Sequence, residues 1–228
     1  MNCIHKSNSM KMKKVLFFVL VLMSLISCTA KKGFVTNLPK QEIEDVQRFP
    51  VLSNIFALDK NDYGFRSDSL STLSTQYIDS YLDKQNNIDI TGRIEINDTV
   101  VQRKINEEIR NLADRAYDNE AIAIIPIPLT IDSILEAQGK RFGLLIYAAG
   151  YERYEVNWQK TYRRFASAAR GLPDFDHYYD FWSSIALIIV DADKNNIAFY
   201  NDSKFEGKPS RQYNIDRQFM ELYYRYWR

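Results

Sequence analysis

The residues best suited to metal or acid–base chemistry cluster once in the sequence, in a short polar stretch. Asp174, Asp176, His177 and Asp180 supply three carboxylates and one imidazole. Such a set could hold a divalent cation, although one imidazole among hard oxygen ligands does not look like a zinc site. Because the spacing matches no metal motif, we favour a polar loop in which His177 makes a structural hydrogen bond.

A second acidic group, Asp191-Ala-Asp193-Lys-Asn195, opens like a calcium-binding loop. The later positions fail the motif, because Asn196 replaces the glycine and Asp202 replaces the final glutamate. Asn and Asp are also the residues that a tight turn between two strands prefers. The sequence therefore predicts a turn here, and it assigns no metal ligand, cofactor or catalytic residue.

The chain begins with a segment typical of a secretory signal peptide. Four lysines precede an apolar run at residues 15–26, and no acidic residue occurs before Glu42. At 1.5 Å per residue this run reaches about 18 Å, well short of the ~30 Å hydrocarbon core of a bilayer. The pattern predicts a cleaved leader at residues 1–27 rather than a membrane-spanning helix.

The apolar run ends on Leu25-Ile26-Ser27-Cys28, which resembles the lipobox of bacterial lipoproteins. The resemblance implies cleavage after Ser27 and acylation of Cys28, by palmitate or a similar chain, which anchors the protein to a membrane. Thr29 follows in place of the aspartate that retains lipoproteins at the inner membrane, which favours the outer membrane, facing the periplasm. The alternative is a secreted protein with a chance cysteine at the cleavage site.

The predicted mature chain lacks the residue types that most enzyme chemistries need. Cys3 is lost with the leader and Cys28 is acylated, so no thiol remains as a nucleophile, zinc ligand or disulfide partner. His177 is the one histidine after residue 27, which excludes a multi-histidine metal site within one chain. With 26 basic and 29 acidic residues, the mature chain has no basic excess, which argues against nucleic-acid binding.

The segment at residues 158–182 is rich in aromatic residues and arginine. It holds eight aromatics in 25 residues, where the chain average of 14% predicts between three and four. These residue types are enriched in interface hot spots and also suit a membrane interface. Large aromatics more often bury surface within their own domain, so the interpretation we favour for the rings is core that covers one end of a sheet. The candidate interface residues are Trp158, Tyr162, Arg163, Arg164, Phe165, Tyr178, Tyr179 and Trp182.

Periodicity predicts the helices that would position these groups. Apolar residues recur at helical spacing over 67–84, where Ser67, Asp68 or Ser69 can cap the helix, and over 101–117. A short helix over 131–138 is expected to end at Gly139. A last helix is expected to begin at Asn214, and the basic, aromatic C-terminus beyond it either docks on the sheet or contacts a partner.

Strands are predicted between these helices. Helices alternating with strands early and a meander late predict a single α/β domain, bordering on α+β, with a mixed sheet covered by amphipathic helices and a C-terminal β-hairpin and helix. We expect a flexible tether at residues 28–49 and the domain at residues 50–228, with Gly150 breaking one strand. The predicted strands are 51–58, 88–96, 121–127, 142–149, 184–190 and 196–201.

The stretch Ile125–Gly150 (IPIPLTIDSILEAQGKRFGLLIYAAG) resembles a family of Bacteroidota lipoproteins that has no assigned activity. A strand pair like Ile185–Tyr200 and a C-terminal helix also occur in that family. The family is rich in glycine and small residues after the shared glycine, whereas this chain is aromatic and charged there. More loosely, the order of elements resembles the α/β domain of the curli-secretion lipoprotein and the N-terminal domain of the Tol-system propeller protein, which implies an assembly module.

These observations favour a membrane-anchored envelope lipoprotein, not an enzyme, whose domain binds a protein partner or assembles with itself. The alternative is a carboxylate-dependent hydrolase acting on cell-wall or other glycans. A cleft with two carboxylates about 5–10 Å apart would favour the hydrolase. An exposed apolar surface built from residues 158–182 would favour the binding module.

Overall fold

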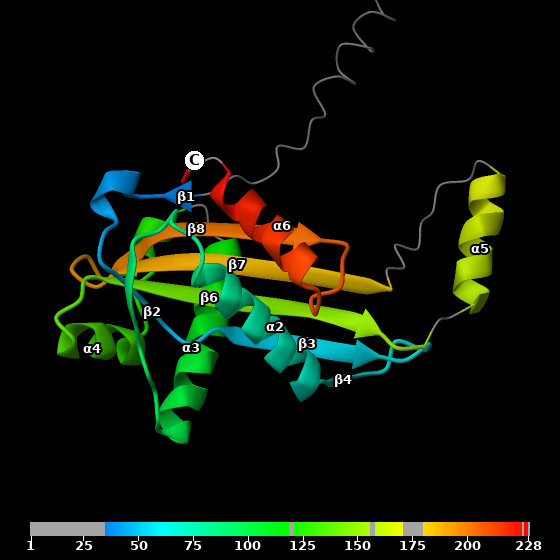
Figure 1. The fold of residues 1–228 in the computed structure, drawn as a ribbon, viewed down its shortest axis with the longest axis horizontal. Coiled ribbons are helices and arrows are strands. Elements are labelled where there is room, and N and C mark those ends of the chain that lie inside the picture. Colours follow the sequence, from blue (N-terminus) through cyan, green and yellow to red (C-terminus); the bar gives the residue numbers. More distant parts are fainter. Residues whose placement is uncertain (1–34, 119–120, 156–157, 171–179, 225, 228) are drawn as a thin grey trace, which may run out of the picture. The chain divides into compact units, whose positions relative to one another are not determined.

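The chain folds into a mixed eight-stranded sheet with helices on both faces (Figure 1). The computed structural model describes residues 35–118, 121–155, 158–170, 180–224 and 226–227. The mixed sheet, its helical cover and the C-terminal hairpin and helix confirm the predicted fold class. Within the described residues, no helix is long and apolar enough to cross a bilayer.

Two long apolar strands form the centre of the sheet. β6 (Phe142–Arg153) pairs antiparallel with β7 (Phe181–Asp191), which forms a hairpin with β8 (Asn196–Phe205). Because helices cover both faces, these strands have continuous apolar runs rather than an alternating pattern. The turn predicted between β7 and β8 is confirmed, and Asn195 adopts the left-handed conformation there, with φ 49°.

Two segments add parallel strands along the other side of β6. β2 (Val46–Arg48) lies between the start of β6 and β5 (Ile90–Arg93), parallel to both. β3 (Leu52–Leu58) then pairs with the later half of β6, and β4 (Gly64–Arg66) forms the edge beside it. β2 and β3 therefore pair with different halves of the same strand, β6.

The prediction of a flexible tether at residues 28–49 is wrong from residue 35 onward. β1 (Val35–Thr36) pairs with β8, and a 3-10 turn, η1 (Lys40–Glu42), leads into β2. The segment reaches the core through four apolar side chains spaced too irregularly to give a periodic signal. These are Leu38, Ile43, Val46 and Phe49, all of which are buried.

One face of the sheet is covered by α2 (Asp68–Leu82) and α6 (Gln212–Tyr223). The predicted cap of α2 is confirmed, because the Ser67 side chain accepts a hydrogen bond from the Leu70 amide. α6 begins two residues before the predicted cap Asn214, whose side-chain amide donates instead to the Lys208 carbonyl at 3.0 Å.

The other face is covered by α3 (Thr99–Asp118) and α4 (Leu129–Ala137). Gly139 ends α4 with φ 63°, as predicted. The strand predicted at residues 121–127 is wrong, because a 3-10 turn, η2 (Ile122–Ile124), and the prolines at 126 and 128 occupy this stretch. Proline cannot donate to a strand ladder, so the buried isoleucines here pack without pairing.

Gly150 does not break β6, which continues without interruption to Arg153. A Cβ at this position would lie 2.3 Å from the Trp182 carbonyl oxygen on the neighbouring strand. The glycine therefore permits a close approach of β6 and β7 rather than a turn.

Candidate functional site

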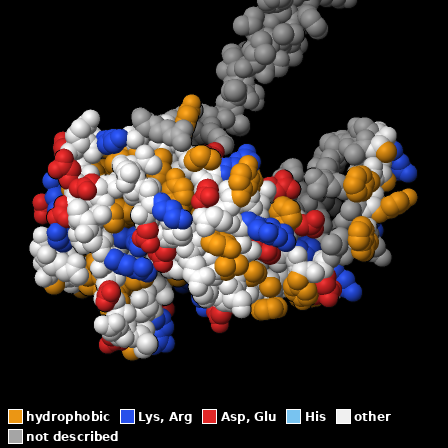
Figure 2. All heavy atoms as spheres, in the orientation of Figure 1, with side chains coloured by type: hydrophobic (Ala, Val, Ile, Leu, Met, Phe, Trp, Pro, Cys, Tyr) orange, Lys and Arg blue, Asp and Glu red, His pale blue; other side chains and the backbone are white. Residues whose placement is uncertain are grey.

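The helix α5 (Trp158–Ala169) connects β6 to β7 and exposes its aromatic side chains. Trp158, Tyr162 and Phe165 share one helix face through their spacing of four and three residues, and they are 75, 74 and 71% exposed. In the space-filling view, hydrophobic side chains gather along this helix (Figure 2). The favoured interpretation of the rings as core is therefore wrong for these three.

The charge on α5 has one sign. Residues 158–170 include Lys160, Arg163, Arg164 and Arg170 and no acidic residue. Arg163 is exposed, beside the aromatic face. The helix thus combines an apolar stripe with a uniformly basic character.

A second aromatic group crosses the strands to which α5 is connected. Phe56 of β3 is in register with Tyr151 of β6, and Tyr151 is in register with Trp182 of β7. The last two rings stack with their centroids 6.5 Å apart. All three are partly exposed, so this predicted interface residue, Trp182, is neither core nor fully solvated. We call the α5 stripe and this cross-strand row the aromatic surface.

Arg153 fixes the end of β6 from which this segment departs. Its side chain is buried and bonds to the Asp59 carbonyl and the Asp62 carboxylate in the β3–β4 turn. Its backbone amide donates to the Asp180 carbonyl at 2.8 Å, just before β7. Both ends of the chain segment that contains α5 are therefore held together by Arg153.

Several predicted site residues lie outside the described residues. These include the lipidation site Cys28 and the interface candidates Tyr178 and Tyr179, and nothing is described of the Arg164 side chain. Of the acidic cluster, Asp180 alone is described, and its carboxylate lies 3.9 Å from the Arg153 Nε. The further members of that cluster, Asp174, Asp176 and His177, are also outside the described residues.

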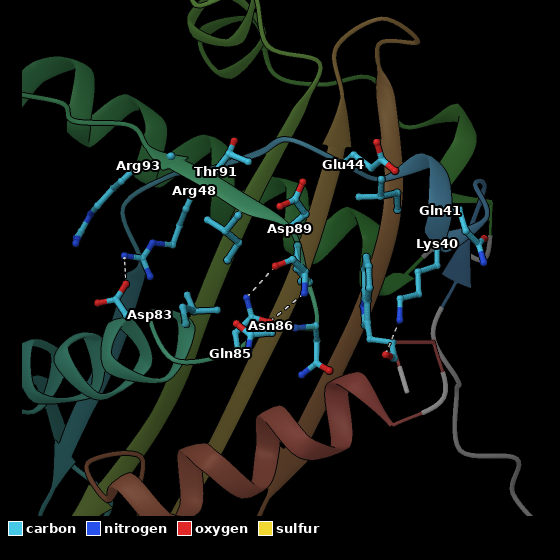
Figure 3. A pocket seen from close by; sticks show the side chains of 17 residues that line it. Lys40, Gln41, Glu44, Arg48, Asp83, Gln85, Asn86, Asp89, Thr91 and Arg93 are labelled. Carbon is cyan, nitrogen blue, oxygen red and sulfur yellow. Dashed lines mark hydrogen bonds and ion pairs between the residues drawn. The ribbon is translucent and has the colours of Figure 1, made fainter.

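A polar cleft lies far along the chain from α5, between η1, β2, β5 and the segment after α2 (Figure 3). It encloses about 740 Å³, and Trp227 of the C-terminus also lines it. Three cationic and three anionic side chains contribute to its lining. They are Lys40, Arg48, Arg93, Glu44, Asp83 and Asp89.

Arg48 is the buried centre of the charges around this cleft, with a side chain only 5% exposed. Its Nη2 donates to the Asp83 carboxylate at 2.9 Å, while its Nη1 lies 3.7 Å from Asp79. Arg93, from the adjacent strand β5, donates to the second oxygen of Asp79 at 3.1 Å. The Arg48 Nε has no hydrogen-bond partner within the described residues.

The segment after α2 is held in place by Gln85. Its side-chain oxygen accepts from the Asn87 and Ile88 amides at 2.6 and 3.0 Å, and its amide donates to the Ile88 carbonyl. Asn86, labelled in Figure 3, and Asn87 thus line the cleft on a fixed loop.

The carboxylates of the cleft give the hydrolase hypothesis little support. Asp83 pairs with Arg48, and Asp89 accepts from the Asp45 amide at 3.0 Å. Two of the three acids are therefore engaged in contacts that hold the cleft together, while Glu44 is exposed.

No family model and no curated protein matches the chain. Two solved structures match, both of the PelC dodecamer from Paraburkholderia phytofirmans, the second a variant in another crystal form. Each has 8% sequence identity and a TM-score of 0.37, over 85% of this chain and 91% of the other. Similarity at this level carries no argument about activity or assembly.

Sequence reasoning missed residues of both regions. Phe56 and Tyr151 could have been found only from the strand register, which brings them into one row with Trp182. Arg48 lies within the predicted tether, and its burial and its ion pairs become visible only once β2 is placed between two other strands.

Proposed function

We propose that this chain is an envelope lipoprotein whose aromatic surface binds a partner protein. In this proposal the acylated Cys28 anchors it to the outer membrane, facing the periplasm. The observation that carries the proposal is the exposure of Trp158, Tyr162 and Phe165 on one face of α5. Large rings exposed together are unfavourable in water and are the residues that dominate binding energy when they are buried in an interface.

The charge of α5 defines the kind of partner. Four basic residues and no acid accompany the aromatic stripe, so the partner surface should be apolar at its centre and acidic at its rim. A protein is favoured over a lipid surface because the cross-strand row of Phe56, Tyr151 and Trp182 adds rings that are already half buried by neighbouring strands. Such fixed rings suit contact with a shaped surface.

Site-specific crosslinking in cells tests this proposal. A photo-crosslinking phenylalanine analogue is introduced at Tyr162 and, as the matched control, at Tyr213, which is 72% exposed on α6. We expect one defined protein adduct from position 162 and none from position 213. The adduct should disappear when Trp158 and Phe165 are both changed to alanine.

Three results would overturn the partner assignment. Equal labelling from both positions would indicate random collision, and labelling of lipid alone would make α5 a membrane-contacting helix. An adduct of twice the chain's own mass would replace the partner by a second copy. The anchor is tested separately, because Cys28→Ser should abolish acyl labelling and membrane attachment, and its retention on the membrane would contradict that part.

A further inference from the structure

The polar cleft has the composition of a ligand site rather than of a packing defect. Its lining is polar on most sides, with buried Leu82 and Ile88 behind it, and its volume of about 740 Å³ lies in the range of small-molecule sites. We propose that it binds a neutral, hydroxyl-rich ligand of the size and chemistry of one or two sugar units.

Arg48 supplies the strongest reason for a ligand. Its guanidinium is buried, and its Nε–H has no acceptor within the described residues, while Nη2 is held by Asp83. A buried donor without a partner is costly, more so on a charged group. Because Arg48 lines the cleft, a ligand oxygen that bonds to this Nε–H would remove that penalty.

The balance of charge determines which ligand fits. Lys40, Arg48 and Arg93 are matched by Glu44, Asp83 and Asp89 around the cleft (Figure 3). A phosphate or other dianion would gain from the first set but be repelled by the second. A neutral ligand can accept hydrogen bonds from the cationic side chains and donate hydrogen bonds to the anionic ones, and it adds no charge that either set would repel.

The amides of the cleft supply the remaining recognition. Gln41, Asn86 and Asn87 line it, and each side-chain amide carries a donor and an acceptor side by side. A sugar hydroxyl both donates and accepts, so it can satisfy an amide or bridge an amide and a carboxylate. Because Gln85 fixes the loop that carries Asn86 and Asn87, these groups are held in position before the ligand arrives.

Titration of the purified full chain tests this proposal, in a detergent without a sugar headgroup. The probes are neutral disaccharides built from glucose, galactose, mannose and N-acetylglucosamine, at about 10 mM to reveal millimolar affinities. Glucuronate and inorganic phosphate are the anionic comparisons. We expect a neutral disaccharide to bind by calorimetry and to shift the NMR signal of the Arg48 Nε–H but not that of the Arg141 Nε–H, which is already bonded to Asp191.

Matched variants locate the binding. Arg48→Lys keeps the charge but removes the Nε–H, and it should weaken binding about tenfold. Arg141→Lys, outside the cleft, should leave binding unchanged. Asn86→Ala alters an exposed side chain that cannot disturb the fold, and it should weaken binding about fivefold. The proposal is overturned if no neutral sugar binds, if binding survives both cleft variants, or if phosphate or glucuronate binds more tightly than every neutral sugar.

Discussion

Two tryptophans show how differently the two ends of this molecule use aromatic residues. Trp158 begins α5 and is 75% exposed, whereas Trp227, near the C-terminus, is 3% exposed beside the polar cleft. Trp227 packs edge-on against Phe199 at 5.7 Å, and its carbonyl accepts from the Lys40 Nζ at 2.7 Å. One ring is presented to solvent and the other holds the C-terminus against the sheet.

The two regions differ in what their aromatic residues do: the α5 rings are available for interaction, whereas the buried residues around the cleft stabilise the fold. The α5 rings of the aromatic surface can be altered with little loss of buried contacts, because they are more than 70% exposed. Around the cleft, buried rings and buried charges support one another, so a change to a buried residue such as Arg48 or Trp227 should destabilise the fold. Mutations can therefore distinguish the two regions through stability alone.

The largest expected effect is on the two tryptophans. Trp227→Ala should lower the free energy of unfolding by about 3–5 kcal/mol, because it leaves a cavity against Phe199 and the sheet. Trp158→Ala should change it by less than about 0.5 kcal/mol, because the ring is already in water. Urea denaturation followed by circular dichroism measures both. Similar losses in the two variants would mean that α5 packs against the domain and that its rings are core.

The next largest effect concerns the charges at the cleft. Arg48→Met should destabilise the chain by about 3 kcal/mol, because Asp79, which is mostly buried, loses one of its two cations. Arg163→Met, on exposed α5, is the control and should alter stability by less than about 0.5 kcal/mol. If Arg48→Met proved neutral, the Arg48 pairs would contribute no net stability and the cleft would not be rigid.

Much of the fold follows from local sequence. The apolar runs of β6 and β7 and the helical stripes of α2 and α3 are strong signals, because burial on both faces or on one stripe dictates residue type directly. The strands before β3 could not be predicted. β1 and β2 are two and three residues long, too short for a periodic pattern, and they are stabilised by pairing with distant strands.

The candidate sites were predictable to different degrees. The aromatic enrichment of residues 158–182 was found because it is a property of composition alone, but the helix α5 and its aromatic stripe were not predicted. The cross-strand row and the cleft were not predicted either, since both depend on which residues the sheet register and the loop after α2 bring together. Gly150 illustrates the limit, because glycine suits both a turn and a close strand approach and only the neighbouring Trp182 carbonyl decides between them.

Removing a tyrosine hydroxyl should have a smaller effect on the free energy of unfolding, and at the buried position the effect should be a gain in stability rather than a loss. Tyr223 is buried in the α6 core and its hydroxyl has no partner within the described residues, so Tyr223→Phe should stabilise the chain by about 1 kcal/mol. Tyr162→Phe on α5 should have no effect. Differential scanning calorimetry of both variants measures this comparison. Destabilisation by Tyr223→Phe would show that the hydroxyl makes a favourable contact.

Alkaline pH sharpens the same comparison. Burial raises the pKa of Tyr223 above its ordinary value of 10.0, so the folded state favours the neutral phenol. The stability that the neutral Tyr223 phenol contributes is fully present below the pKa of this tyrosine in the unfolded chain. It is lost as the pH rises above that value, because the unfolded chain then ionises while the folded chain does not. Above about pH 10, the wild type should therefore lose stability more steeply than Tyr223→Phe, while Tyr162→Phe should follow the wild type.

The smallest effect is expected at the rim of the cleft, where Asp45 accepts hydrogen bonds from the Lys140 Nζ at 2.7 and 2.9 Å and from Thr91. The Lys140 bonds, followed by the Thr91 bond, hold the pKa of Asp45 below its usual value. Because the pKa of Asp45 is lower in the folded chain than in the unfolded chain, its ionised carboxylate stabilises the fold at pH values above the unfolded pKa. That stabilisation is lost as the pH falls through the folded pKa.

Lys140→Met should therefore flatten the decline in stability on acidification, measured by urea denaturation at successive pH values below about 5. Its stability should meet that of the wild type at the acid end, where Asp45 is protonated in both. Arg66→Met, which removes an exposed pair with Asp68 at the edge strand β4, is the matched control and should leave the acid slope unchanged. An equal change in both variants would mean that Lys140 acts through net charge alone, and that the rim of the cleft is no better organised than the exposed edge near the aromatic surface.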